Sequence, residues 1–344
     1  MDKLALVTGG SGYFGDLLVS KLLEHDYKVR VFDLLDVDDR KPGVEFVQGD
    51  IRDLDAVKRA CEGVTVAHHN VAQVPLAKDK ELFWSVNQGG TENLLKAAIG
   101  QQVGKVVYTS SSAVFGVPTE LPVTEETKPV PAEAYGEAKL AGEKLCFEAR
   151  EQGLDVSIVR PRTIMGHGRL GIMQILFEWI REGYNVPVFD SGDNRYQFVH
   201  AEDMADACRL AGERAGPGIY NIGTDRFSTM RETLEALVEH AGTGSRVKSV
   251  SSKPAVLGMK VTSALGLSPL GAYHALMYGK NMWFDCTRAN EELGWQPRFS
   301  NEEMFIQSYD WYLQNRDSVL SQSGGSHHRS AVKQGVLKLI PRLI

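Results

Sequence analysis

Two side chains with complementary chemistry lie four residues apart in a segment of helical pattern, residues 135–139 (YGEAK). This spacing places Tyr135 and Lys139 on one face of a helix. An unperturbed tyrosine, with a pKa of about 10, is a poor base at neutral pH, but a nearby ammonium favours its phenolate form. The pair could therefore exchange a proton with a substrate hydroxyl, and Lys139 could also hold the ribose of a nicotinamide cofactor.

A run of serines lies upstream, in residues 108–116 (YTSSSAVFG), where a predicted central strand ends. Sheets of the α/β class place their ligands at the carboxyl ends of their strands. A serine hydroxyl in this position can donate a hydrogen bond to a substrate oxygen as a carbonyl forms.

A glycine-rich segment, residues 8–15 (TGGSGYFG), joins the first predicted strand to the first predicted helix. Glycines at this junction allow a tight turn and bring backbone N–H groups close to a pyrophosphate, which the helix N-terminus also attracts. We therefore predict a dinucleotide site whose first contacts come from Gly9, Gly12, Tyr13, Phe14 and Gly15.

An acidic residue, Asp33, ends the second predicted strand, eighteen residues after Gly15. A carboxylate there accepts hydrogen bonds from the adenosine ribose hydroxyls and repels a 2′-phosphate, so NAD is favoured over NADP. After the next predicted strand, Asp50 and Ile51 are placed to hold the adenine edge.

The elements that must position these residues alternate along the chain in a regular way. Short apolar runs are separated by segments of helical period, which predicts βαβ units and an α/β fold with a Rossmann-type, doubly wound parallel sheet. Beyond Pro161 the alternation becomes irregular, which predicts a smaller, interleaved and mostly helical substrate lobe. The predicted strands are 4–7, 28–35, 44–47, 64–68, 105–110 and 156–160.

The expected domain organisation follows from the point at which the alternation of strand and helix patterns becomes irregular. The NAD-binding domain comprises residues 1–165, with 198–222 returning to it. Residues 166–197 and 223–316 form the substrate lobe, and 317–344 form a linker and a basic amphipathic tail.

Together these motifs resemble the extended short-chain dehydrogenases/reductases of the NAD-dependent epimerase/dehydratase family, over roughly residues 3–314. Additional signatures are 87–95 (NQGGTENLL), 160–161 (RP), 198–203 (FVHAED) and 293–297 (LGWQP).

The resemblance implies a Ser-Tyr-Lys triad in which Ser111 is the serine beside Tyr135 and Lys139. It also implies that Asn87 lies near the cofactor, that Val71 lines the nicotinamide side, and that the protein forms a homodimer.

Departures from the family pattern reduce the number of reactions that we expect the protein to catalyse. Sugar 4,6-dehydratases carry Asp-Glu where Ser112 and Ala113 stand, and decarboxylating relatives carry Glu at the second position. The leading hypothesis is therefore an NAD-dependent epimerase of nucleotide sugars that forms a transient 4-keto intermediate and returns the hydride, or a closely related dehydrogenase that releases the ketone. The alternative is a reductase or dehydrogenase for a hydrophobic alcohol, such as a 3β-hydroxysteroid or a β-hydroxy lipid. The candidate substrate residues are Ser112, Thr163, Arg169 and Arg195, and Arg162 could join the two arginines in binding a diphosphate.

Composition limits the remaining possibilities. The 344 residues carry a formal net charge of −6, which argues against a nucleic-acid surface. The four cysteines are scattered, and we expect no metal site. We expect a cytoplasmic location because no signal peptide or apolar span is evident. The tail, residues 331–344, could touch a membrane surface weakly or pack against its own protein.

Overall fold

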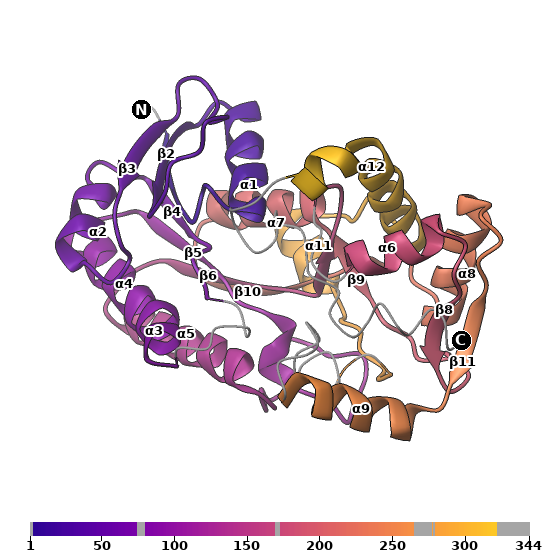
Figure 1. Cartoon of the computed structure of the whole chain (residues 1–344). Coiled ribbons are helices and arrows are strands. Elements are labelled where there is room, and N and C mark those ends of the chain that lie inside the picture. The colour runs from indigo at the N-terminus through magenta and orange to yellow at the C-terminus, as the bar shows by residue number, and fades with distance from the viewer. Residues whose placement is uncertain (1–2, 74–79, 169–172, 265–276, 278, 322–344) are drawn as a thin grey trace.

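A seven-stranded, fully parallel sheet forms one half of the protein, in the order β10-β6-β5-β4-β1-β2-β3 (Figure 1). The computed structural model describes residues 3–73, 80–168, 173–264, 277 and 279–321. The order reverses direction between β1 and β4, which is the crevice where doubly wound sheets bind ligands. The strands are β1 (Leu4–Thr8), β2 (Lys28–Asp33), β3 (Glu45–Gln48), β4 (Val66–His69), β5 (Lys105–Thr109), β6 (Val156–Pro161) and β10 (Gly218–Ile222). The predicted Rossmann-type fold class is confirmed.

Helices cover both faces of this sheet, which is why its strands are apolar runs rather than alternating ones. Helices α1 (Tyr13–Glu24) and α7 (Ala201–Glu213) pack on one face, in a core that includes Leu18 and Met204. Helices α2 (Leu54–Cys61), α4 (Gly90–Gly100) and α5 (Ala134–Glu151) pack on the other. The short helix α3 (Lys80–Trp84) and the π-helical turn η1 (Ser85–Gly89) lead into α4.

A third hydrophobic core includes Phe177, Leu234 and Phe305. Helix α6 (Met173–Arg181) and helix α8 (Met230–Ala241) pack with the two-stranded parallel sheet of β8 (Val186–Phe189) and β11 (Val247–Val250). Helices α9 (Ser252–Ala264), α11 (Thr287–Leu293) and α12 (Asn301–Ser321) complete the chain order.

The segment 198–200 differs from the sequence-based expectation. Residues Phe198 and Val199 do not return to the main sheet but form β9 (Phe198–His200), which pairs with β7 (Thr163–Met165) in a separate parallel pair. After β6, the chain rejoins the main sheet at β10, which pairs in parallel with β6.

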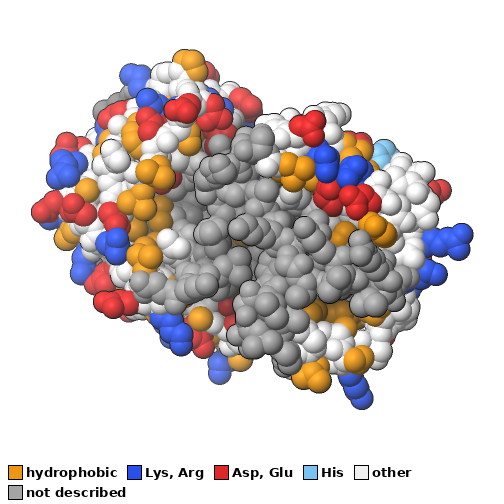
Figure 2. All heavy atoms as spheres, in the orientation of Figure 1, with side chains coloured by type: hydrophobic (Ala, Val, Ile, Leu, Met, Phe, Trp, Pro, Cys, Tyr) orange, Lys and Arg blue, Asp and Glu red, His pale blue; other side chains and the backbone are white. Residues whose placement is uncertain are grey.

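Helix α12 extends to Ser321, over the first residues of the segment that we expect to be a linker. The rest of that segment, including the amphipathic tail, lies outside the described residues. Within the described part of the chain, no helix combines the length and apolarity needed to cross a membrane. Acidic and basic side chains are interspersed around the described part of the face shown in Figure 2.

Candidate active site

The glycine-rich loop between β1 and α1 is held in a tight turn by its own backbone. Gly9 has a φ of +72°, and its N–H donates to the carbonyl oxygen of Phe32 at 2.9 Å. A Cβ on Gly15 would lie 2.1 Å from the Gly9 carbonyl oxygen, so only glycine lets helix α1 begin this close to the turn. The turn therefore lies directly at the N-terminus of helix α1, where a pyrophosphate binds favourably.

Asp33 lies beside this loop at the end of β2. Its carboxylate accepts hydrogen bonds from the backbone N–H of Ser11 at 3.1 Å and from that of Leu34 at 2.7 Å. Burial raises the pKa of Asp33, and these N–H donors counteract part of that rise. The hydroxyl of Ser11 is buried and has no partner among the described residues. These polar groups fit the adenosine ribose of a dinucleotide.

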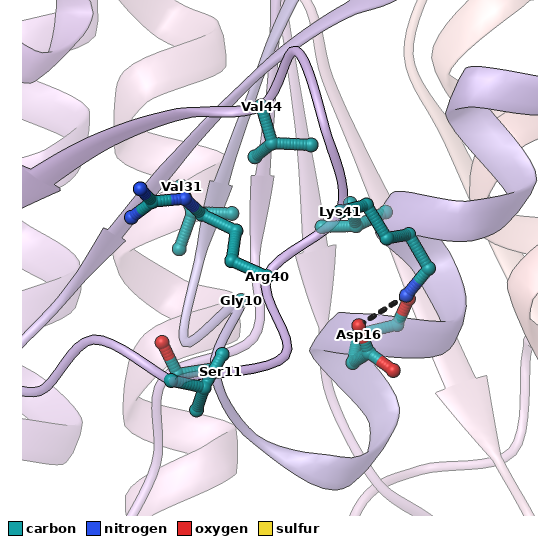
Figure 3. Close-up of a pocket in the computed structure, with 9 residues that line it drawn as sticks. Gly10, Ser11, Asp16, Val31, Arg40, Lys41 and Val44 are labelled. Carbon is teal, nitrogen blue, oxygen red and sulfur yellow. Dashed lines mark hydrogen bonds and ion pairs between the residues drawn. The ribbon is translucent and has the colours of Figure 1, made fainter.

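A small recess beside the loop is lined by Ser11, Arg40 and Lys41, and Lys41 points toward Asp16 (Figure 3). This arrangement is not evident from the sequence. Lys41 forms an ion pair with Asp16, and Arg40 forms one with Asp36. Both ion pairs are partly exposed, with side-chain exposures between 31% and 45%. An exposed ion pair is weak, so the expected preference for NAD rests on Asp33 and not on this recess.

Asp50 and Ile51, which we expect at the adenine edge, follow β3. The carboxylate of Asp50 forms an ion pair with Arg52, and this hydrogen bond lowers the pKa of Asp50. Ile51 is buried, and its carbonyl oxygen accepts a hydrogen bond from the Asn93 amide at 3.1 Å.

The Ser111 loop and the start of helix α5 are packed directly against each other. Ser111 caps the short 3₁₀ turn η2 (Ser112–Phe115), and its hydroxyl accepts from the N–H of Ala113 at 3.2 Å. Glu133 caps α5 by accepting from the N–H groups of Tyr135 and Gly136, both at 2.8 Å. A Cβ on Gly136 would lie 2.3 Å from the Ala113 carbonyl oxygen, so a glycine after Tyr135 is what allows this contact.

Lys139 links the same helix to the end of β5. Its ammonium donates to the Thr109 carbonyl oxygen at 2.8 Å and lies 5.9 Å from the centre of the Tyr135 ring. Burial lowers the pKa of Lys139 to about 8. Tyr135, Lys139 and the Ser111 loop are thus assembled at one strand end, as their order in the sequence predicts.

A buried network bridges the ends of β1 and β4 at the crevice between these strands. His69 is hydrogen-bonded to Thr8 at 2.8 Å and to Thr91 at 3.0 Å, and burial lowers its pKa to about 3. Thr91 in turn donates to the Asn87 carbonyl oxygen at 2.7 Å. The neutral imidazole is therefore a structural link, and nothing in the local sequence around His69 indicates its partners.

Asn87 and Val71, which we expect beside the nicotinamide, lie against and in the loop that follows β4. The Asn87 side chain accepts a hydrogen bond from the backbone N–H of Gln73 at 2.8 Å and donates one to the backbone carbonyl oxygen of Gln73 at 3.1 Å. The N–H of Val71 lies 3.2 Å from the position of a Cβ on Gly9. Asn87 thus holds the loop after β4 against the glycine turn.

This geometry agrees with the comparisons with known proteins. A model of the NAD dependent epimerase/dehydratase family matches residues 5–223. The chain belongs to this family. The predicted family is confirmed, and because the family is NAD-dependent, the cofactor is NAD.

Similar proteins cover nearly the whole chain. An uncharacterised protein of Sinorhizobium fredii is 54% identical, covering 98% of this chain and 86% of its own. A UDP-glucose 4-epimerase of Mycolicibacterium smegmatis is 30% identical, with coverages of 89% and 97%. The crystal structure of a UDP-glucose 4-epimerase of Thermotoga maritima with UDP-glucose superposes with a TM-score of 0.76 at 26% identity, covering 91% and 99% of the two chains.

The expected substrate residues are only partly brought together in this family member. Thr163 in β7 shares a hydrogen bond of 2.9 Å with the Tyr196 hydroxyl. Ser112 is buried and accepts from Arg162 at 2.7 Å. Arg195 is exposed, and its guanidinium stacks on two aromatic rings, Phe227 at 4.8 Å and Trp283 at 5.3 Å. Arg169 lies outside the described residues.

A buried ion pair behind the serine loop, between Glu143 and Arg160, was not predicted from the sequence. Both oxygens of Glu143 accept from Arg160, at 2.8 and 2.7 Å, and one also accepts from the Ser110 hydroxyl at 2.6 Å. Tyr135, Lys139 and Glu143 are spaced i, i+4 and i+8 on one helical face, so this spacing could have indicated the third residue.

Changing Glu143 to Gln is expected to lower the free energy of unfolding by about 3–5 kcal/mol, because a buried guanidinium loses its counter-charge. Urea titration followed by circular dichroism measures this change. Glu148→Gln, on an exposed turn of the same helix, is the matched control and is expected to shift stability by less than about 0.5 kcal/mol. Equal stability of the two variants would show that the ion pair carries little of the fold's stability.

Proposed function

We propose that the protein is an NAD-dependent epimerase of nucleotide sugars, with Ser111, Tyr135 and Lys139 as its catalytic residues. The observation that carries the proposal is the packing of the Tyr135–Lys139 helix turn against the serine loop, with Lys139 bonded to the end of β5. The similarity to UDP-glucose 4-epimerases over nearly the whole chain supports the substrate class.

In the proposed mechanism, the Tyr135 phenolate accepts the proton of a substrate hydroxyl, and the Lys139 ammonium stabilises the negative charge on the phenolate. The Ser111 hydroxyl donates to the substrate oxygen while it becomes a carbonyl. NAD held by the glycine loop, Asp33 and Lys139 would accept the hydride of the carbinol carbon and would return it to the opposite face of the resulting carbonyl. In that second half-reaction Tyr135 gives its proton back to the oxygen.

The test is a panel of UDP- and dTDP-sugars incubated with the NAD-loaded protein, with products identified by nuclear magnetic resonance. We expect one sugar to be converted to its epimer without accumulation of NADH. Stoichiometric NADH formation with release of a ketone, or turnover of a lipid ketone instead, would contradict epimerisation and support the alternative dehydrogenase.

The buried ammonium predicts a pH dependence of this activity. The pKa of Lys139 is lowered by burial to about 8, so the cation is present below that pH and is lost as the pH rises through it. Because loss of the cation removes the support for the phenolate, kcat/KM is expected to fall on the alkaline side with an apparent pKa near 8.

This alkaline decline of kcat/KM is measured by pH–rate profiles of the wild-type protein and of the variant Lys139→Arg. Arginine stays charged over this range, so its profile should lack the alkaline decline even if its overall rate is lower. A wild-type profile that stays flat to pH 10 would exclude Lys139 as the titrating group.

A further inference from the structure

Two arginines are buried in the described part of the chain, Arg160 and Arg162, with exposed fractions of 2% and 1%. Arg160 uses its Nε and Nη2 atoms to bind both carboxylate oxygens of Glu143. In Arg162 the same two atoms, Nε and Nη2, are buried and have no hydrogen-bond partner among the described residues. The Nε–Nη2 edge of Arg160 therefore faces a carboxylate, whereas the same edge of Arg162 has no hydrogen-bond acceptor among the described residues.

The surroundings of Arg162 hold it in place but do not neutralise it. Its Nη1 atom donates to the Ser112 hydroxyl at 2.7 Å. The guanidinium carbon lies 4.6 Å from the Tyr196 ring centre and 5.6 Å from that of Phe284. Aromatic faces attract a cation but carry no net charge. No acidic side chain of the described residues forms an ion pair with Arg162.

Burying a cation is costly unless an opposite charge and good hydrogen bonds compensate for the lost hydration. The planar edge formed by Nε and Nη2 matches the two oxygens of a carboxylate, as the Arg160–Glu143 pair illustrates within the same protein. The missing counter-charge of Arg162 should therefore be a carboxylate that is not part of the described chain.

The position of Arg162 relates this carboxylate to the reaction. Its anchor, Ser112, directly follows Ser111, whose hydroxyl we propose to contact the reacting oxygen. Because Arg162 is anchored on the loop that carries Ser111, we infer that a carboxylate bound by Arg162 would lie near the reacting carbon. In a nucleotide sugar the diphosphate is attached across the ring from C4, whereas the carboxylate of a hexuronic acid is attached to the neighbouring C5. In a 3-hydroxy acid it is similarly close to the carbinol.

We propose that Arg162 is a specificity-determining residue that binds a substrate carboxylate in a bidentate manner. The substrate is accordingly an acid whose carboxylate lies within two carbons of the oxidised carbinol. This inference rests on the proposed function for the position of the reacting carbon, but the binding of the acid can be measured without turnover.

The test compares the affinities of two matched pairs of probes for the NAD-loaded full chain by calorimetry: UDP-glucuronate with UDP-glucose, and 3-hydroxyoctanoate with its methyl ester. We expect the acid of at least one pair to bind ten times or more tightly than its neutral partner. The change Arg162→Met should remove that preference while leaving NAD affinity within twofold. Arg162→Lys keeps the positive charge but lacks the planar edge with two N–H donors, so this variant should retain only part of the preference for the acid.

A second measurement does not depend on choosing the right substrate. Malonate should raise the thermal unfolding midpoint of the wild-type protein above its value in chloride of equal ionic strength, and should do so less in Arg162→Met. Arg226→Met removes an exposed arginine paired with Glu303 and should behave like the wild type.

Equal binding of acid and neutral probes together with no malonate effect would overturn the proposal, as would an acid preference that survives in Arg162→Met. Stabilisation by inorganic phosphate but not by malonate would also overturn it in favour of a phosphate subsite. If epimerisation fails while the acid preference and its loss in Arg162→Met are observed, the proposed reaction is wrong and the acid site stands.

Discussion

Replacing Tyr135 with Phe is expected to lower kcat by about 10²- to 10⁴-fold, the usual contribution of a well-placed general acid–base group. The substitution removes only the phenolic oxygen and keeps the ring, which lies 5.9 Å from the Lys139 ammonium. The helix cap at Glu133 binds backbone N–H groups and is not affected. NAD affinity, measured by fluorescence titration, should therefore change by less than about twofold.

The matched control for this experiment is Tyr184→Phe, which removes a phenol outside the proposed site and should leave kcat unchanged. Activity of Tyr135→Phe above a tenth of the wild-type value would exclude Tyr135 as the proton carrier. A parallel loss of activity and NAD affinity would instead assign it a role in cofactor binding.

Changing Gly15 to Ala is expected to weaken NAD binding by about 10- to 100-fold. The new Cβ would lie 2.1 Å from the Gly9 carbonyl oxygen and 2.7 Å from the Gly10 Cα, both backbone atoms that can move only with the turn. Relieving such an overlap costs about 1–3 kcal/mol, and the displaced loop is the one that should contact the pyrophosphate. Titration with NADH fluorescence measures the dissociation constant.

Gly100→Ala provides the comparison, because its Cβ would meet nothing within 4 Å at the end of helix α4. This variant should bind NADH as the wild type does. Unchanged affinity in Gly15→Ala would show that the loop tolerates the shift and that the glycine is not needed for the cofactor.

Much of the proposed site could be predicted from sequence because its parts are local. The four-residue spacing of Tyr135 and Lys139 determines a shared helical face, whatever the rest of the chain does. The glycine segment must turn where a strand meets a helix, and Asp33 comes at the end of the next strand. The alternation of apolar runs and helical patterns likewise predicts the parallel sheet, because strands covered on both faces are apolar throughout.

Only the tertiary structure decided which charges are compensated and which are not. Arg160 and Arg162 are two residues apart and equally buried, yet one meets Glu143 and the other meets Ser112 and two aromatic rings. The pairing of β9 with β7 is similarly a property of the folded chain. Such partners are distant in sequence, and their contacts depend on how helices and strands pack, which local periodicity does not encode.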